Sequence, residues 1–358
     1  MKKFLARHRR IKIYIFLIII IVWLICMAIQ TKGIRLRSYE SKSYPGQAFG
    51  TSIKKTLYMD DEAERDEVDK AIDALLNSLD ERLSYRNSES ELAICNRSYV
   101  LDGIVELSSD ILGYIKREME ICKETEGAFS PCILPLSKLW GIEDGASDIP
   151  SQDEIDKVLS HIDPSDIKIV DDGISFHSYD MELDLGAVGK GIAADEVMKL
   201  LDEKKVPGAI ISIGGTIAVY GDKGKDDKWY VGIQDPRDKE GNVFGVLEVS
   251  GGSVVSTSGD YEKYFEADGK RYHHIFDPKT GYPADNGLIS VTICSDDGFL
   301  SDAMSTACFV MGLDEGMKYA KKKGVDAIFV TSDKKVYVTK SVKKRFVLKA
   351  DEYEIAKR

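Results

Sequence analysis

One segment near the carboxyl end carries oxygen ligands at helical spacing. Residues 300–307 read LSDAMSTA, in which Asp302 and Thr306 are four positions apart. If Ser301 caps a helix, this spacing places the Asp302 carboxylate and the Thr306 hydroxyl on one face. One carboxylate and one hydroxyl suit Mg²⁺, which keeps coordination positions for water and substrate phosphates. Taken alone, the motif is more typical of a solvated first helical turn.

A second segment combines small residues with a predicted transition from strand to helix. Residues 183–192 read LDLGAVGKGI, with a strand running into Gly186 and a helix beginning near Lys190. Small residues let the backbone approach a ligand, and a helix amino terminus favours anions. An ordinary tight turn has the same pattern. A P-loop is excluded, because Gly191 replaces the required Ser or Thr and Asp184 replaces the first Gly, and no GxGxxG supports a Rossmann fold.

A third segment places a histidine beside hydroxyl-bearing residues. Residues 255–265 read VSTSGDYEKYF, and residues 273–281, HHIFDPKTG, follow closely. His274 ends a short predicted strand, just before a turn that the Asp-Pro and Thr-Gly pairs indicate. A histidine can accept a proton near neutral pH. An isolated histidine is more often a structural hydrogen-bonding group, so both roles stay open.

The elements that position these segments alternate between helix and strand. Apolar periodicity predicts helices over residues 61–83, 108–125, 190–204 and 301–323. Strands are predicted over residues 167–177, 208–220, 228–234, 245–257, 272–276 and 288–295, with a hairpin over 326–348. No repeat and no long linker divides this body. The pattern predicts a single α+β domain of mixed sheet and helix layers.

The first thirty residues differ from the rest of the chain. Residues 1–12 hold six Lys or Arg and no acid, and residues 13–31 are 19 consecutive uncharged residues. Such a run spans a bilayer as a transmembrane helix, and its basic flank keeps the amino terminus in the cytoplasm. A cleaved signal peptide is the alternative, but no small-residue cleavage pattern follows. The sequence therefore predicts a single-pass cell-membrane protein with a stalk over residues 32–46 and an extracytoplasmic catalytic body.

Composition narrows the class of partner. The chain has 358 residues and a net charge of −11, although its first twelve residues are basic. An acidic body repels phosphate backbones, which argues against a general nucleic-acid binder. The six cysteines show no CxxC or metal-finger spacing. Cys294 and Cys308 fall in apolar stretches and are predicted to be buried thiols.

Together these motifs resemble one known family. The stretches LDLGAVGKG, ISIGGTIAVYG, VSTSGDYEKYF with HHIFDPKTGYP, and SDAMSTACFVMG occur in the same order as in the FAD:protein FMN transferases, the ApbE-like family. Two earlier stretches, in residues 83–96 and 127–141, are also similar to that family. The resemblance covers roughly residues 48–350, and six ordered motifs are specific where each alone is weak. It implies an ApbE-like, T-fold-like domain over residues 47–350, with a tail over 351–358.

The resemblance also implies roles for individual positions. Asp184 and Lys190 match residues that contact FAD, and the Ala187 carbonyl would join Asp302 and Thr306 on Mg²⁺. His274 matches the family's histidine near the reacting phosphate. The flavin and adenosine pockets would be lined by Phe49, Tyr85, Ala128, Phe129, Ser130 and Ile275. Three positions depart from the family pattern, which usually has Asp at Ser130, commonly Met at Phe49 and often Asp at Thr216.

The implied chemistry is a phosphoryl transfer from FAD, which is FMN joined to AMP through a pyrophosphate. A threonine hydroxyl of an acceptor protein would attack the FMN phosphorus, and AMP would leave. His274 is the candidate to accept the hydroxyl proton, since its reference pKa of about 6.5 lies near the working pH. The product would be an extracytoplasmic electron-transfer protein carrying covalent flavin. Two alternatives stay open: an FAD pyrophosphatase, or a non-catalytic membrane-tethered flavin-binding module.

Overall fold

A nine-stranded sheet forms the centre of the computed structural model, which describes residues 39–98, 103–224, 228–238 and 240–356. Its order is β1-β2-β6-β7-β10-β13-β14-β15-β17, and each neighbouring pair is antiparallel except β15 and β17. The strands are β1 (Ser41–Ala48), β2 (Thr51–Tyr58), β6 (Gly208–Ile213), β7 (Thr216–Gly221), β10 (Ser253–Gly259), β13 (Leu288–Ser295), β14 (Asp326–Thr331), β15 (Lys335–Val338) and β17 (Glu354–Ile355).

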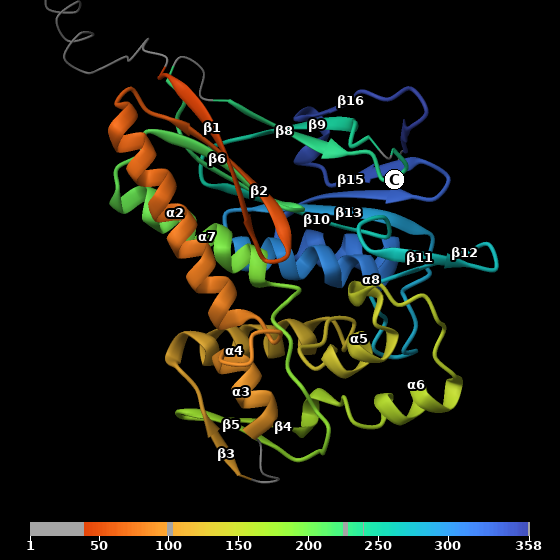
Figure 1. The fold of residues 1–358 in the computed structure, drawn as a ribbon. Helices are drawn as coiled ribbons and strands as arrows, with labels where there is room; N and C mark the ends of the chain where they lie inside the picture. The colour runs from red at the N-terminus through yellow and green to blue at the C-terminus, as the bar shows by residue number, and fades with distance from the viewer. Residues whose placement is uncertain (1–38, 99–102, 225–227, 239, 357–358) are drawn as a thin grey trace, which may run out of the picture.

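Helices cover one face of this sheet (Figure 1). α7 (Gly189–Glu203) packs on β6 and β7, and α8 (Gly298–Lys323) packs on β10 and β13. α2 (Glu62–Leu83) lies against α7 and β1. It begins where the Asp61 side chain accepts the Glu64 amide at 2.9 Å, and it buries Val68, Ile72 and Leu76 at helical spacing.

A smaller sheet covers the opposite face. It consists of β8 (Trp229–Gln234), β9 (Val243–Val249) and β16 (Phe346–Leu348), in the order β16-β9-β8. Trp229 and Phe244 pack in one apolar cluster with Val255 and Ile328 of the large sheet. The large sheet is therefore covered on both faces at its centre. This explains why β13 is buried along almost its whole length and is mostly apolar.

A further region lies on the side of α7 and α8 away from the large sheet (Figure 1). It holds α3 (Glu91–Ser98), α4 (Ser109–Glu124), α5 (Leu134–Trp140), α6 (Gln152–Leu159), the 3₁₀ turns η1 (Ile142–Asp144) and η2 (Pro164–Asp166), and the sheet of β3 (Ile104–Glu106), β5 (Gly173–Phe176) and β4 (Ile167–Val170). The Trp140 indole donates to the Gly281 carbonyl at 2.8 Å. Gly281 follows the hairpin of β11 (Tyr264–Ala267) and β12 (Lys270–His273), so this bond joins the region to the rest of the molecule.

Two glycines allow α7 and α8 to meet closely. A Cβ added at Gly191 in α7 would lie 2.2 Å from the Gly298 carbonyl oxygen, and one at Gly298 would lie 2.5 Å from the Gly191 carbonyl oxygen. Any side chain at either position would collide with backbone. The contact therefore requires glycine on both helices, and it brings the first turns of α7 and α8 together.

The predicted elements are largely present, but several bounds differ. The stretches predicted as single strands over 167–177, 208–220 and 245–257 are each two strands, because turns at 171–172, 214–215 and 251–252 reverse the chain. The hairpin predicted over 326–348 consists of β14 and β15, whereas β16 pairs with β9 of the small sheet. The predicted cap Ser301 lies inside α8 instead, where its hydroxyl donates to the Val254 carbonyl. Asp297 is the cap, accepting the Leu300 amide at 2.9 Å. The predicted buried thiols, Cys294 and Cys308, are both buried.

The structure also corrects predictions about the chain ends. The predicted stalk over 32–46 overlaps β1, since residues 41–46 pair with β2. The predicted tail over 351–358 contributes β17 and the buried Tyr353. The predicted single-pass membrane location is not supported, because no helix among the described residues is long and apolar enough to cross a membrane. The predicted anchor itself, residues 13–31, lies outside the described residues.

Gly191→Ala is expected to destabilise the fold. The added methyl group would force α7 and α8 apart, at a cost of roughly 1–3 kcal/mol in the free energy of unfolding. Denaturant unfolding followed by circular dichroism measures this. Gly113→Ala is the control, because Gly113 lies inside α4 with open space at its Cβ position, and alanine favours a helix by about 1 kcal/mol. A Gly191→Ala protein as stable as the wild type would contradict the close contact.

Candidate active site

The fifth residue of α8 is a buried aspartate whose carboxylate lies against the first turn of α7. Asp302 is 4% exposed, and its Oδ2 accepts the Gly191 amide at 2.8 Å. Its Oδ1 accepts the Thr216 hydroxyl at 3.2 Å. Burial raises the pKa of Asp302, while the neighbouring Lys190 opposes that rise. Thr306 lies one turn further along α8, on the same face as the sequence predicts.

The loop before α7 is fixed by a buried asparagine. The Asn96 amide group of α3 donates to the Leu183 carbonyl and accepts the Leu183 amide, both at 2.9 Å. The next residue, Asp184, donates its amide to the Pro131 carbonyl at 2.9 Å. Its carboxylate accepts the Gly186 amide at 2.8 Å, and burial raises its pKa to about 6. Ala187 therefore lies between a fixed loop and the amino terminus of α7.

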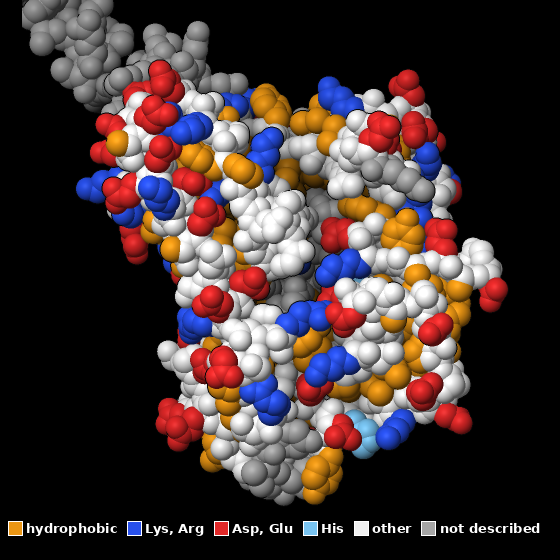
Figure 2. Space-filling model, in the orientation of Figure 1, with side chains coloured by type: hydrophobic (Ala, Val, Ile, Leu, Met, Phe, Trp, Pro, Cys, Tyr) orange, Lys and Arg blue, Asp and Glu red, His pale blue; other side chains and the backbone are white. Residues whose placement is uncertain are grey.

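Lys190 is surrounded by acidic groups. The Asp302 carboxylate is the largest cause of its raised pKa, followed by Glu262, Glu143 and Asp184. The Glu262 side chain extends to the turn between β6 and β7, since a Cβ added at Gly215 would lie 2.9 Å from its Oε1. These acidic groups come from four separate segments of the chain. Figure 2 shows the hollow between the sheet-bearing part and the lower helical part, with basic and acidic side chains at its rim.

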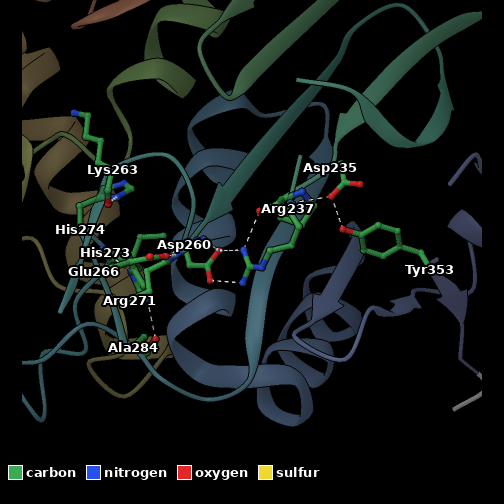
Figure 3. Close-up of polar contacts among 12 residues, drawn as sticks. Asp235, Arg237, Asp260, Lys263, Glu266, Arg271, His273, His274, Ala284 and Tyr353 are labelled. Atoms are coloured by element: carbon green, nitrogen blue, oxygen red, sulfur yellow. Dashed lines mark hydrogen bonds and ion pairs between the residues drawn. The ribbon is translucent and has the colours of Figure 1, made fainter. Parts of the chain in front are cut away.

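His274 follows β12 and is held by the turn before β11 (Figure 3). Its Nδ1 lies 3.2 Å from the Lys263 carbonyl oxygen, which also accepts the His274 backbone amide at 3.2 Å. A carbonyl oxygen can only accept, so Nδ1 carries the hydrogen and Nε2 keeps its lone pair in the neutral ring. Burial lowers the pKa of His274 to about 4, and the Glu143 carboxylate partly offsets this. The pKa near 6.5 expected from sequence is therefore corrected downwards.

A chain of ion pairs joins His274's turn to two other segments. The Lys263 Nζ lies 2.9 Å from Glu143 Oε1, and the Arg86 guanidinium lies 3.2 Å from Glu143 Oε2. Arg86 also pairs with Asp144 at 2.6 Å. Its guanidinium carbon lies 4.9 Å from the centre of the Tyr85 ring. These ion pairs thus connect the segment after α2, the turn η1 and the turn before β11.

The neighbouring histidine has a structural role. His273 is buried, its Nε2 donates to the Ala284 carbonyl at 3.0 Å and its Nδ1 accepts the Ile275 amide at 3.2 Å. Both ring nitrogens are therefore used within the fold. The turn between β10 and β11 is held by Asp260, whose carboxylate accepts two hydrogen bonds of 2.7 Å from Arg237 (Figure 3).

Most of the residues predicted to line the ligand pockets lie near the loop before α7, whereas Ile275 packs against α8. Tyr85 is half-buried, and both burial and the nearby Asp184 raise its pKa. The Phe49 ring faces Gly189 at the start of α7, 3.7 Å from the position of an added Cβ. Ala128, Phe129 and Ser130 immediately precede Pro131, and the Phe129 side chain packs in the central core. Ile275 packs in the same apolar cluster as Met304 and Cys308 of α8.

Three residues near the site were not predicted from sequence. Glu143 lies in a loop region without a motif, so no signal pointed to it. Glu262 stands inside the GDYEKY stretch, next to residues that were singled out, and its charge was the available signal. Thr216 was noted only as a departure from the family pattern. Its role as the hydrogen-bond donor to Asp302 needs the three-dimensional structure.

The residues predicted to hold a metal ion offer only oxygen donors, which is the chemistry that a small divalent cation prefers. No group of three or more His, Cys, Asp or Glu side chains gathers as a metal site within the described ranges. The candidate ligands are instead one carboxylate, one hydroxyl and one backbone carbonyl, all of which are oxygen donors. Each Asp302 oxygen accepts one hydrogen bond and keeps a lone pair. Such a sparse set suits Mg²⁺ bound together with water and substrate phosphates.

Comparison with known proteins identifies the family. The chain is 32% identical over 308 residues to the FAD:protein FMN transferase of Klebsiella pneumoniae, covering 85% of this chain and 93% of that protein. It is 33% identical over 289 residues to the enzyme of that name from Treponema pallidum, covering 75% and 79%. These curated relatives are enzymes of the transferase class.

Solved structures agree with the sequence relatives. The ApbE protein of Thermotoga maritima matches with a TM-score of 0.78 and 29% identity, over 86% of this chain and 99% of that one. The flavin transferase ApbE of Vibrio cholerae matches with a TM-score of 0.76 and 25% identity, over 86% and 99%. The predicted single mixed α+β domain of the ApbE type is thus confirmed. The sequence model described as the ApbE family matches residues 49–329, and this chain belongs to that family.

Proposed function

We propose that this chain transfers FMN from FAD onto a threonine hydroxyl of an acceptor flavoprotein, with release of AMP. The observation that carries the proposal is the meeting of Asp302, Lys190 and the Gly191 amide where α7 and α8 touch. A cationic side chain and a helix amino terminus favour the phosphates of a dinucleotide. The names of the relatives, all of them FAD:protein FMN transferases, support the same activity.

Asp302, Thr306 and the Ala187 carbonyl would hold Mg²⁺ in this reaction. When bound, the ion would neutralise the pyrophosphate and the charge that develops on the transferred phosphoryl group. Lys190 adds positive charge on the same side of the cleft. Asp184, Phe49, Tyr85, Ile275 and residues 128–130 would contact FAD, and residues 47–350 would form the catalytic domain.

His274 would act as the general base. In the neutral ring Nε2 is free to accept a proton, because Nδ1 donates to the Lys263 carbonyl. As the threonine oxygen bonds to the FMN phosphorus, its proton moves to Nε2 and the bond between phosphorus and the AMP oxygen breaks. The imidazolium then releases its proton to solvent. The Glu143 carboxylate favours this transient cation.

The function is tested by incubating the purified full chain with FAD and Mg²⁺, with and without a flavoprotein that a related transferase modifies. Chromatography measures AMP, and mass spectrometry measures the acceptor. We expect AMP, and a mass gain of one FMN on the acceptor, only when both proteins are present. Asp302→Ala should give neither product. AMP without acceptor would identify an FAD pyrophosphatase, and no AMP at all would identify a flavin-binding module.

His274→Asn is expected to lower transfer roughly 10²–10⁴-fold, the usual contribution of a general base. Flavin fluorescence should show that FAD still binds. Wild-type activity should be lost as pH falls through the His274 pKa of about 4, because only the neutral ring accepts a proton. His273→Asn is the control, expected to lose thermal stability but to keep this acid limb. Near-normal transfer by His274→Asn at saturating FAD would rule out the catalytic role.

Glu143→Gln is expected to lower the pKa of His274. The carboxylate raises that pKa, so its removal makes the ring a weaker base and slows transfer. Histidine NMR of the full chain across a pH series measures the pKa directly. Asp144→Asn is the matched control, expected to leave the His274 pKa unchanged. Asp144 also pairs with Arg86, but its side chain is 60% exposed, so solvent screens its charge. An unchanged His274 pKa in Glu143→Gln would show that Glu143 has no such influence.

A further inference from the structure

On the face of β10 that packs against α8, two serines lie next to the side chains that surround the proposed cation site. Side chains alternate along a strand, so Val254, Ser256 and Ser258 share this face. Val254 belongs to the core beneath α7 and α8, whereas Val255 belongs to the cluster under the small sheet. Thr257, on the second face, contacts the Thr292 hydroxyl at 2.9 Å.

Ser256 supports Asp302 through Thr216. The Thr216 hydroxyl lies 3.0 Å from the Ser256 hydroxyl and 3.2 Å from Asp302 Oδ1, and both hydroxyl residues are fully buried. An ionised carboxylate can only accept, so Thr216 donates its hydrogen to Asp302. Its own oxygen must then accept from Ser256. The direction of both hydrogen bonds is therefore determined.

Ser258 contacts the second side-chain ligand, Thr306, directly. The Ser305 hydroxyl donates to the Asp302 backbone carbonyl at 2.8 Å, which uses its only hydrogen. The Ser258 hydroxyl, 2.7 Å from Ser305, must therefore donate to it. Thr306 lies 3.2 Å from Ser258 and can only be the donor in that contact. Its hydrogen thus points to β10, and its oxygen lone pairs are left for a cation.

We propose that Ser258, Ser256 and Thr216 are positioning residues for the cation site. Ser258 orients the lone pairs of Thr306, and the Ser256–Thr216 pair orients those of Asp302, towards one ion. The inference rests on the ligand set of the proposed function. The same inference assigns a role to Thr216. A threonine at this position donates a hydrogen bond to Asp302, whereas a second carboxylate there would repel the Asp302 carboxylate. Loss of the Ser258 hydroxyl should let Thr306 point its hydrogen at the cation. Loss of the Thr216 hydroxyl should let the Asp302 carboxylate rotate.

The test measures cation affinity rather than turnover. Mn²⁺ prefers the same oxygen ligands as Mg²⁺ and is counted by electron paramagnetic resonance, here with the full chain and saturating FAD but no acceptor. Ser258→Ala and Thr216→Val should raise the dissociation constant of Mn²⁺ roughly 10- to 100-fold, the usual effect of removing an outer partner of a ligand. Thr216→Ser keeps the hydroxyl and should remain within about twofold of wild type.

Thr257→Val is the matched control, since it removes a hydroxyl from the same strand on the opposite face. It should bind Mn²⁺ like the wild type, and thermal melts without Mn²⁺ should show that every variant compared is folded. If wild type binds Mn²⁺ and both Ser258→Ala and Thr216→Val match it, the positioning role is wrong and the ligand set stands. If wild type releases AMP but binds no Mn²⁺, the ligand set and the positioning role fall together.

Discussion

The contact between Gly191 and Gly298 is the constraint on which the site depends. Two backbones meet there at a distance that excludes any side chain. As a result the Gly191 amide reaches the Asp302 carboxylate, and Lys190 stands beside it. A carboxylate buried in this way needs hydrogen-bond donors and an opposite charge to remain ionised. The junction supplies both from the first turn of one helix.

The charge around this junction explains why the proposed reaction needs a cation. The carboxylates of Asp302, Glu262, Glu143 and Asp184 surround Lys190, and they outnumber it even though Lys263 and Arg86 pair with Glu143. A pyrophosphate entering alone would meet net repulsion. In the proposed reaction, a divalent ion bound together with the pyrophosphate would reverse this balance, and Asp302 would be a ligand of the ion instead of a source of repulsion. The same acids favour the imidazolium of His274 through Glu143.

Local pattern was enough to predict the long helices α2, α4, α7 and α8, the loop before α7 and the spacing of Asp302 and Thr306, but it missed the short helices α3, α5 and α6. These features depend on neighbours within a few residues, such as the Asp61 cap and the four-residue interval on α8. The start of α8 was misplaced because Asp297 and Ser301 are both good caps, and only packing decides between them. His274 was noticed from the hydroxyl-bearing residues near it, whereas the resemblance to a family placed it near the reacting phosphate and supplied the FAD-contacting positions.

Features that depend on distant contacts were not predictable. Glu143 meets Lys263, which is 120 residues away in the chain. The lowered pKa of His274 comes from burial, which no local pattern reveals. Likewise Thr216 reaches Asp302 only because β7 and α8 flank β10.

The central claim is that Ala187, Asp302 and Thr306 form one cation site at the junction of α7 and α8. The most direct measurement is anomalous X-ray scattering from a crystal of the protein grown with FAD and Mn²⁺. The account predicts an anomalous peak within bonding distance of the Ala187 carbonyl, the Asp302 carboxylate and the Thr306 hydroxyl. A peak at another position, or FAD bound in the cleft with no peak beside Asp302, would contradict it.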